Sequence, residues 1–432
     1  MGSYWAATGG QAPSHPPLAA DADCEVAIIG GGYTALAAAD ALAARGADVL
    51  LLEAREIGWG ASGRNGGSVT PRYKMSFCAL EAAYGAETAR RLHRLLHDGV
   101  AAIKENVARF AIDCEHAECG QVTAAHSPAA LKTLADDVAW LQRIGDPVPR
   151  LLSRAESVER LGLDLYHGAY LDMRGARVHP LRYARGYAGG LAGRGVRIHA
   201  RTPATGIAGR RGAFTVDTAP GARVRARQVI LATDSYLGPE LGLARFRRHF
   251  ITVASALITT APLSAEARRR IDPGRHVVAD SFALLNYFPM LPDGRLLFGG
   301  RGKVTSREDE ARVFEILEGR MRQLFPVLGD TPVTHRWSGL VGLSPDNLPH
   351  VAALEPGLHV AFGYGGRGVV LSHVLGRVLS AAVLGEDLAP FGPLAGALPP
   401  PFRFHGLKRR MIGAAVRWYA LRDRLQAGRG PH

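Results

Sequence analysis

Residues 24–53 constrain the fold more than any other part of the chain, and they read CEVAIIGGGYTALAAADALAARGADVLLLE. A short apolar run at 26–29 predicts a buried strand that ends in three glycines. The alanine-rich stretch 34–44 predicts a helix, and a second apolar run at 49–52 predicts another strand. Strand, helix and strand in this order form a right-handed βαβ unit with parallel strands. The sequence therefore predicts an α/β fold that begins with a Rossmann-like unit.

The glycines of this unit match a pattern typical of dinucleotide sites. Gly30, Gly32 and Ala35 occupy the three small positions of G-x-G-x-x-G/A. The first permits the turn, the second lets the backbone approach a pyrophosphate at the helix N-terminus, and the third allows close packing. Glu53 lies 21 residues after Gly32, at the end of the second strand, where a carboxylate can accept hydrogen bonds from ribose hydroxyls. We predict a dinucleotide site that also includes Tyr33, Thr34, Ala54 and Arg55.

A second glycine-rich stretch, GWGASGRNGG at 58–67, follows Glu53 almost directly. Five of its ten residues are glycine, which predicts tight turns or a backbone that closely approaches a ligand. A plain NAD-binding domain would usually begin its next helix here. From residue 30 to this point the sequence resembles the FAD-binding start of the D-amino-acid oxidase (DAO) superfamily, and it is most similar to the gamma-glutamylputrescine oxidase-like branch. The likeness recurs at 176–180, 284–301, 336–352 and 363–380.

The resemblance implies a fold of two interleaved domains. An FAD-binding Rossmann-like domain of the glutathione-reductase/DAO type is expected from residues 20–100, 161–240 and 331–392. An antiparallel-sheet substrate domain is expected from 101–160 and 241–330. The pattern itself predicts helices within 79–111 and 128–144, a hairpin around residues 292–294, and strand, turn and helix within 357–385. A basic amphipathic helix is predicted at 403–429.

The resemblance also implies where the flavin lies. Besides the first glycine motif, the residues expected to bind it are Gly60, Ala61, Ser62, Arg64, Asn65, Gly66, Gly67, Ala204, Ala232, Thr233, Gly339, Gly366, Gly368 and Val369. A solvated loop cation is the alternative interpretation of Arg64. The late turn GYGGRGV would bring backbone N–H groups at a helix N-terminus to the N1/C2=O side of the ring. Reduced flavin is negatively charged there, and a helix N-terminus stabilises negative charge.

The implied chemistry is FAD-dependent oxidation of the C–N bond of an amine or amino acid, with hydride passing to flavin N5 and hydrolysis of the resulting imine. Five residues are candidates for the substrate side: Tyr287, Arg301, Trp337, Tyr364 and Arg367. Aromatic walls suit a cationic or apolar amine, although core packing explains Tyr287 and Trp337 equally well. Arg367 stands inside a glycine turn, at a position that relatives often give to histidine.

Two lysines of sarcosine-oxidase-like members are absent. In those members one lysine, just after the late turn, binds the substrate carboxylate; this chain has Val369-Val370-Leu371 there. The other lysine, on the hairpin strand, assists the reaction with O₂; this chain has Leu296-Leu297-Phe298 there. These absences make a small amino acid bound in the sarcosine mode less expected and argue against rapid use of O₂. The resemblance still implies an oxidase that produces H₂O₂. The alternatives are a dehydrogenase that passes electrons to a quinone or carrier protein, and a non-catalytic flavin-binding subunit. Relatives with covalent flavin use a late cysteine; the last cysteine here is Cys119, so we predict non-covalent FAD.

Charge and composition limit the partners. The net charge is +13, of which +7 comes from eight basic residues and one acidic residue within 403–429. No nucleic-acid-reading motif accompanies this charge, so no nucleic-acid partner is expected. The tail could lie on an anionic membrane surface, but packing on its own protein is the favoured interpretation. Four scattered cysteines and the absence of a signal-peptide pattern predict a cytoplasmic protein, and no metal site is predicted.

Overall fold

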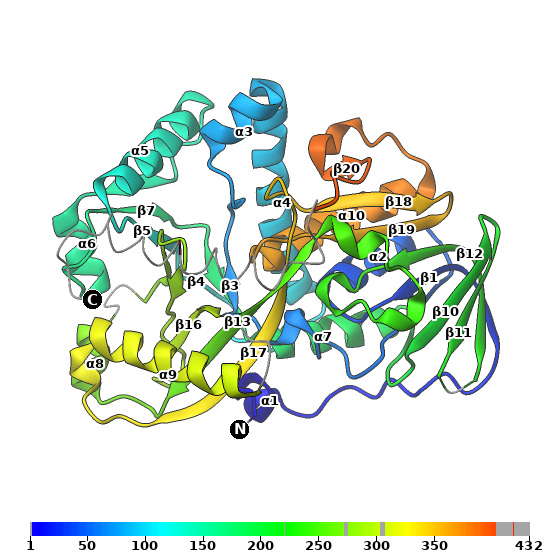
Figure 1. The fold of residues 1–432 in the computed structure, drawn as a ribbon, viewed down its shortest axis with the longest axis horizontal. Coiled ribbons are helices and arrows are strands. Elements are labelled where there is room, and N and C mark those ends of the chain that lie inside the picture. Colours follow the sequence, from blue (N-terminus) through cyan, green and yellow to red (C-terminus); the bar gives the residue numbers. More distant parts are fainter. Residues whose placement is uncertain (1, 220, 272–274, 303–306, 403–417, 419–432) are drawn as a thin grey trace.

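A computed structural model describes residues 2–219, 221–271, 275–302, 307–402 and 418, with the side chains of 301–309 left out. Two large sheets lie side by side, and helices cover them (Figure 1). The α-helices are α1 Tyr4–Thr8, α2 Tyr33–Ala43, α3 Phe77–Tyr84, α4 Ala86–Arg109, α5 Pro128–Arg143, α6 Arg154–Leu161, α7 Pro180–Ala192, α8 Ala265–Arg270, α9 Arg307–Leu324 and α10 Gly368–Leu384.

The first sheet is built on the predicted βαβ unit. Its order is β20-β18-β19-β12-β1-β2-β9, and β10 and β11 extend from β12 as an antiparallel ribbon. The strands β19, β12, β1, β2 and β9 are parallel neighbours along this order. The bounds are β1 Ala22–Ile29, β2 Val49–Leu52, β9 Arg197–His199, β10 Ala204–Arg210, β11 Ala213–Thr218, β12 Arg223–Leu231, β18 His350–Glu355, β19 Leu358–Phe362 and β20 Ala395–Gly396.

The second sheet has eight strands in the order β17-β13-β16-β15-β14-β5-β7-β6, and its neighbours are antiparallel except for the parallel pair β14 and β5. Its bounds are β5 Gln121–Ala124, β6 Arg150–Leu152, β7 Ala169–Asp172, β13 Ile251–Thr260, β14 Val277–Asp280, β15 Asn286–Tyr287, β16 Leu297–Gly302 and β17 Val333–Leu343. A three-stranded sheet, β3 Ser68–Val69, β4 Ala117–Glu118 and β8 Ala176–Arg177, lies between them.

The main core forms where α2, α4 and α10 pack together against the first sheet. Helix α10 is mostly apolar and almost wholly buried apart from Arg377, as expected of a helix inside a core rather than on a surface. Apolar residues of α9 cover one face of the second sheet and form a separate core with it. The opposite face of that sheet turns toward the ends of β1 and β2. A large cavity lies there.

The N-terminal residues form a strap, residues 2–18, that joins the two sheets along the lower edge of Figure 1. At its start, Tyr4 Oη donates to Asp293 Oδ2 over 2.9 Å, which fixes α1 to the hairpin of the second sheet. At its end, the N–H of Leu18 donates to Thr202 Oγ1 over 3.1 Å, beside the first sheet. The sequence analysis assigned no role to this segment.

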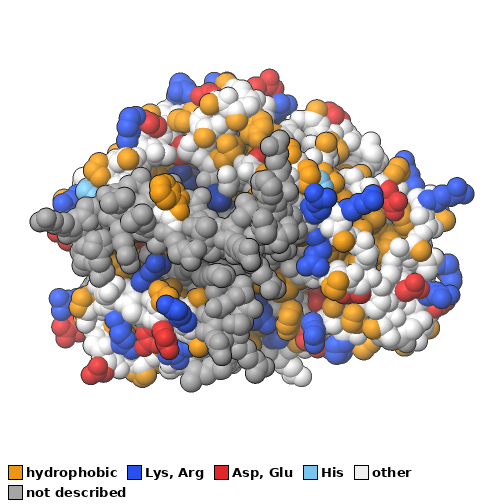
Figure 2. Space-filling view, viewed as in Figure 1, with side chains coloured by type: hydrophobic (Ala, Val, Ile, Leu, Met, Phe, Trp, Pro, Cys, Tyr) orange, Lys and Arg blue, Asp and Glu red, His pale blue; other side chains and the backbone are white. Residues whose placement is uncertain are grey.

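The α/β fold agrees with the sequence-based expectation. The region 79–111 is two helices rather than one, because Gly85 adopts a φ of +83° that ends α3 and begins α4. Nearly all of the predicted tail helix, 403–429, falls outside the described residues. Within the described part, no helix is both long and apolar enough to cross a membrane. On the face drawn in Figure 2, basic side chains are interspersed with acidic ones.

Candidate functional site

A cavity of about 1000 Å³ runs between the two sheets, from the carboxyl ends of β1 and β2 to the exposed face of the second sheet. This volume is at the upper end of the range of ligand sites, about 300–1000 Å³, and suits a dinucleotide-sized ligand with a second small molecule beside it. Its lining includes nearly all residues expected to bind a flavin. Of these, only Ala35 and Gly67 do not line it.

The first glycine loop, residues 30–32, leads from β1 into α2. Gly30 has a φ of +116°, and a Cβ there would lie 2.8 Å from the carbonyl oxygen of Ala232. Gly32 precedes the helix without a side-chain cap, so α2 presents its N-terminus to the cavity. A Cβ at Gly32 would meet Ser62 Oγ at 2.8 Å. Close backbone approach and a positive φ therefore require glycine at position 30, whereas a side chain at position 32 would displace Ser62.

Glu53 ends β2 beside this loop. Its two carboxylate oxygens accept from the N–H groups of Gly31, over 2.6 Å, and Arg55, over 2.7 Å. Burial raises the pKa of Glu53, and the two backbone N–H groups oppose that shift. Each oxygen keeps a further lone pair for a hydroxyl donor in the cavity. This is the arrangement that a dinucleotide ribose needs.

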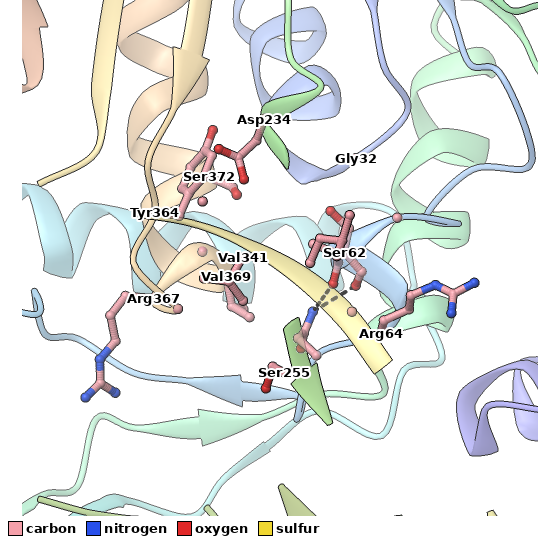
Figure 3. A pocket seen from close by; sticks show the side chains of 18 of the residues that line it. Gly32, Ser62, Arg64, Asp234, Ser255, Val341, Tyr364, Arg367, Val369 and Ser372 are labelled. Carbon is pink, nitrogen blue, oxygen red and sulfur yellow. Dashed lines mark hydrogen bonds between the residues drawn. The ribbon is translucent and has the colours of Figure 1, made fainter. Parts of the chain in front are cut away.

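The second glycine loop, residues 58–67, packs against α2. Ser62 Oγ accepts from the N–H of Tyr33 over 3.0 Å. Asn65 Nδ2 donates to the carbonyl oxygens of Ala61 and Ser62, which are the dashed lines of Figure 3. Arg64 Nε donates to the carbonyl of Trp59 over 2.7 Å. Arg64 is thus part of the loop's own bonding and points away from the other labelled residues of Figure 3.

Two buried indoles hold this loop from behind. Trp5 Nε1 donates to the carbonyl of Asn65 over 2.8 Å, and Trp337 Nε1 donates to the carbonyl of Arg64 over 2.9 Å. In a trans peptide the N–H points opposite to the carbonyl, so the N–H groups of Asn65 and Gly66 point away from the indoles. Both of these residues line the cavity. The indoles therefore orient two backbone donors toward the ligand.

This geometry corrects the prediction for Trp337. Its side chain is 4 % exposed and does not line the cavity, because the indole lies behind the second glycine loop. Trp5, 1 % exposed, has the matching role and was missed by the sequence analysis. The only local signal was Ser3, whose side chain caps the short helix α1.

The late glycine turn, residues 363–366, leads from β19 into α10. Gly363, Gly365 and Gly366 all have positive φ. Helix α10 begins without a side-chain cap, and Gly368 and Val369 of its first turn line the cavity. Asp234 Oδ1 accepts from the N–H of Gly363 over 2.9 Å, and burial raises the pKa of Asp234. A second helix N-terminus is thus directed into the cavity.

Tyr364 and Arg367 belong to this turn. Tyr364 Oη and Thr34 Oγ1 are 2.6 Å apart, so the phenol connects the N-termini of α10 and α2. Burial raises the pKa of Tyr364, which keeps the phenol neutral. This placement makes Tyr364 a link between the two helices rather than an obvious substrate contact. Arg367 lines the cavity, and in Figure 3 it extends to the side opposite Arg64.

Tyr287 of β15 stands on the cavity face of the second sheet. Its Oη is 3.0 Å from Ser255 Oγ, and its ring lies between two glycines. A Cβ at Gly66 would be 2.8 Å from the ring, and a Cβ at Gly299 would be 2.1 Å from it. Tyr287 lines the cavity, and its role on the substrate side stays a prediction. Arg301 pairs with Ser255 through its backbone, but its side chain lies outside the described part.

Polar side chains that no motif predicted line the far end of the cavity. Arg72 is 7 % exposed; its Nη2 donates to Asp137 Oδ2 over 2.5 Å and its guanidinium carbon lies 4.3 Å from the Tyr170 ring centroid. Arg72 Nη1 is buried and has no hydrogen-bond partner among the described residues. The same holds for Gln121 Oε1. Unpartnered buried polar atoms on a cavity wall fit a polar ligand group.

Comparison with known proteins gives matches of three kinds. Residues 25–382 match the family model "DAO: FAD dependent oxidoreductase". The chain is 33 % identical to "Gamma-glutamylputrescine oxidoreductase" of Escherichia coli (strain K12), over 98 % of both chains. It is 31 % identical to "Probable oxidoreductase OrdL" of Rhizobium meliloti (strain 1021), over 98 % of this chain and 97 % of that one. The crystal structure of glycine oxidase from Geobacillus kaustophilus aligns with a TM-score of 0.71 at 22 % identity, and covers 88 % of this chain and 100 % of that one.

Proposed function

We propose a substrate class and residue roles from one premise: this chain belongs to the DAO family of FAD-dependent oxidoreductases. It is an enzyme that oxidises the C–N bond of an amine or amino acid with FAD. When bound, FAD would supply the acceptor for a hydride from the carbon next to nitrogen, and water would hydrolyse the imine. The protein's own task is to hold the cofactor, orient the amine and exclude water.

The cavity residues suit FAD in three places. The uncapped N-terminus of α2 would receive the diphosphate, and Glu53 would accept from the ribose of the adenosine half. The outward N–H groups of Asn65 and Gly66 and the first turn of α10 would surround the flavin ring. Helix N-termini stabilise negative charge, which favours the reduced ring. We assign the whole predicted set of cofactor residues to this task, with Ala35 and Gly67 as packing positions.

For the substrate we propose an amine whose far end carries a carboxylate or amide. The observation that carries this proposal is Arg72: the residue lines the cavity, and its buried Nη1 has no hydrogen-bond partner among the described residues. A substrate carboxylate or carbonyl would pair with it, and Gln121 would supply a second contact. Tyr287 would form the wall beside the reacting carbon. The relative named gamma-glutamylputrescine oxidoreductase suggests gamma-glutamylputrescine, which has such a polar end and a free amine at the other.

Proton removal from the amine would not rely on a histidine, because no histidine is among the described residues that line the cavity. A neutral amine is needed for hydride transfer, so the substrate would lose its proton on entering the apolar region around Tyr287. The rate of reduction should then rise with pH toward the pKa of the bound amine.

The test is anaerobic reduction of the flavin, followed by absorbance, with gamma-glutamylputrescine, putrescine, pipecolate and sarcosine. We expect gamma-glutamylputrescine to bind at least about tenfold more tightly than putrescine, which lacks the polar end. Arg72→Lys keeps a charge for Asp137 but lacks the planar fork, and should reduce this preference. Equal binding of both amines by the wild type would refute the substrate proposal. A protein that no amine reduces would refute the activity.

For the electron acceptor we propose O₂, with a quinone or carrier protein as the alternative. Leu296, Leu297 and Phe298, where some relatives carry an oxygen-activating lysine, are fully buried apolar residues, an observation that favours the alternative. Oxygen consumption compared with dye reduction under the same substrate decides between them. The cytoplasm remains our predicted location, and the role of the basic tail remains a prediction.

A further inference from the structure

Three metal-ligand side chains converge on one point away from the cavity. His93 and His97 lie one turn apart on the same face of α4, as residues i and i+4 do. Asp146 comes from the turn after α5, where Gly145 adopts a φ of +87° and reverses the chain. None of the three lines the cavity described above. They were not singled out by the sequence analysis, which predicts no metal site.

The three ligand atoms are spaced as a small cation would space them. His93 Nε2 is 2.9 Å from both His97 Nε2 and Asp146 Oδ2, and His97 Nε2 is 3.9 Å from Asp146 Oδ2. Ligand atoms around tetrahedral Zn²⁺, at about 2.0–2.1 Å from the ion, are about 3.3 Å from one another. The observed spacings bracket this value. The side chains are 9 %, 23 % and 11 % exposed in the order His93, His97 and Asp146.

Hydrogen bonding alone does not satisfy this arrangement. An imidazole nitrogen carries either one hydrogen or one lone pair. A hydrogen on His93 Nε2 would have to be shared between the carboxylate and the second imidazole. A lone pair on the same atom could accept from His97 but would face the lone pairs of Asp146. A cation between the three atoms satisfies all three at once.

We propose that His93, His97 and Asp146 bind one divalent transition-metal ion, with Zn²⁺ the best match for two imidazoles and one carboxylate. Water would complete the four-coordinate shell. The site is independent of the proposed FAD chemistry.

The surroundings support the proposal electrostatically. Arg174 donates to both oxygens of Asp146, over 3.2 and 2.8 Å, and to both oxygens of Asp172. Two carboxylates and one guanidinium leave a net charge of −1 when both imidazoles are neutral, so a dication meets a net negative site. Burial lowers the pKa of both histidines, and neutral imidazole is the form that binds a metal ion. Arg174 also fixes the carboxylate from behind, as groups around metal ligands commonly do.

The position of the site suggests what the ion does. Helix α4 packs against α10, whose N-terminus faces the cavity, whereas Asp146 follows α5 and Arg174 follows β7 of the second sheet. The ion would therefore tie α4 to the turn after α5, and its contribution would be to stability rather than to electron transfer.

The experiment uses untagged, FAD-loaded protein that has been treated with EDTA and desalted. After titration with ZnCl₂ alone, mass spectrometry should find one Zn²⁺ per chain. The titration should give a Kd below about 1 μM, and Zn²⁺ should raise the melting temperature of the protein. Asp146→Asn and His97→Gln keep the side-chain shapes and should weaken binding about 100-fold or more. FAD content, measured separately by absorbance, should not change.

The matched control is His350→Gln. His350 Nε2 is 2.9 Å from Asp346 Oδ1, an imidazole–carboxylate pair with no third ligand among the described residues, so the control should bind zinc as the wild type does. Wild-type protein that takes up no zinc would overturn the proposal without any variant being needed. Zinc that binds equally to the wild type and to Asp146→Asn would also overturn it, because the ion would then sit on others of the 16 histidines.

Discussion

Replacement of Trp5 by phenylalanine tests whether the N-terminal strap belongs to the cofactor site. The change keeps an aromatic ring in the buried position and removes only the N–H that donates to the carbonyl of Asn65. That carbonyl then has no donor, and water cannot replace the indole because Trp5 is 1 % exposed. The peptide between Asn65 and Gly66 becomes free to rotate, and the N–H of Gly66 loses its direction toward the cavity.

The size of the effect follows from the cost of an unpaired buried carbonyl, about 1–3 kcal/mol. The loop must keep its shape only when the cofactor is bound, so most of this cost falls on the FAD-bound state. At about 1.4 kcal/mol per factor of ten, FAD affinity should fall about 5- to 150-fold. Trp337→Phe removes the neighbouring donor and should act in the same direction.

The measurement is the Kd of FAD for apoprotein, from flavin fluorescence, together with the shape of the visible flavin spectrum. Tyr4→Phe is the matched control, because it removes the bond from α1 to Asp293 but leaves the indole in place. We expect the control to bind FAD within about twofold of the wild type. The reasoning fails if Trp5→Phe and Tyr4→Phe bind FAD equally well, or if both lose affinity together with melting temperature. A double variant of Trp5 and Trp337 measures their coupling.

Three further predictions concern other parts of the site. Burial raises the pKa of Asp280 to about 7, so this group stabilises the folded state at low pH, and that contribution is lost as pH rises from about 4 through 7. In Asp280→Asn, Asn286 can turn its unpartnered Oδ1 toward the new amide. The variant should lose less free energy of unfolding between pH 5 and pH 8 than the wild type, as measured by urea unfolding. Gly299→Ala would place a Cβ 2.1 Å from the Tyr287 ring, and should destabilise the fold by about 1–3 kcal/mol and raise KM for the amine, measured by unfolding and by steady-state kinetics. Acid precipitation should release the flavin into the supernatant; flavin retained in the pellet would contradict non-covalent binding.

The sequence predicted the cofactor half of the site better than the substrate half, for a physical reason. The dinucleotide unit is local: Gly30, Gly32 and Glu53 lie on adjacent elements, and Glu53 accepts from the N–H of Gly31 within that unit. Hydrophobic periodicity and turn residues are enough to locate such a unit. The late turn before α10 could be found in the same way, from glycines between a strand and an apolar helix.

Arg72 and Trp5 could not be found in this way, because their roles depend on partners far along the chain. Arg72 pairs with Asp137, 65 residues away, and Trp5 donates to Asn65, 60 residues away. Neither residue belongs to a periodic pattern or a spaced motif. Trp337 is a prediction that failed for the same reason. This aromatic residue of β17 was predicted to face the substrate, but its indole donates to the carbonyl of Arg64 in the second glycine loop.

The second glycine loop contacts three separate parts of the protein, and this gives it a role beyond cofactor binding. The strap supplies Trp5, β17 supplies Trp337, and the hairpin supplies Tyr287, whose ring leaves no room for a side chain at Gly66. Two of these three contacts come from the second sheet, which also forms the substrate wall. A substrate that shifts the hairpin would therefore press on the peptide that directs N–H groups toward the flavin. We therefore predict that substrate binding and the electrostatic environment of the ring are coupled through this loop, whose Gly66 permits the close contact with Tyr287.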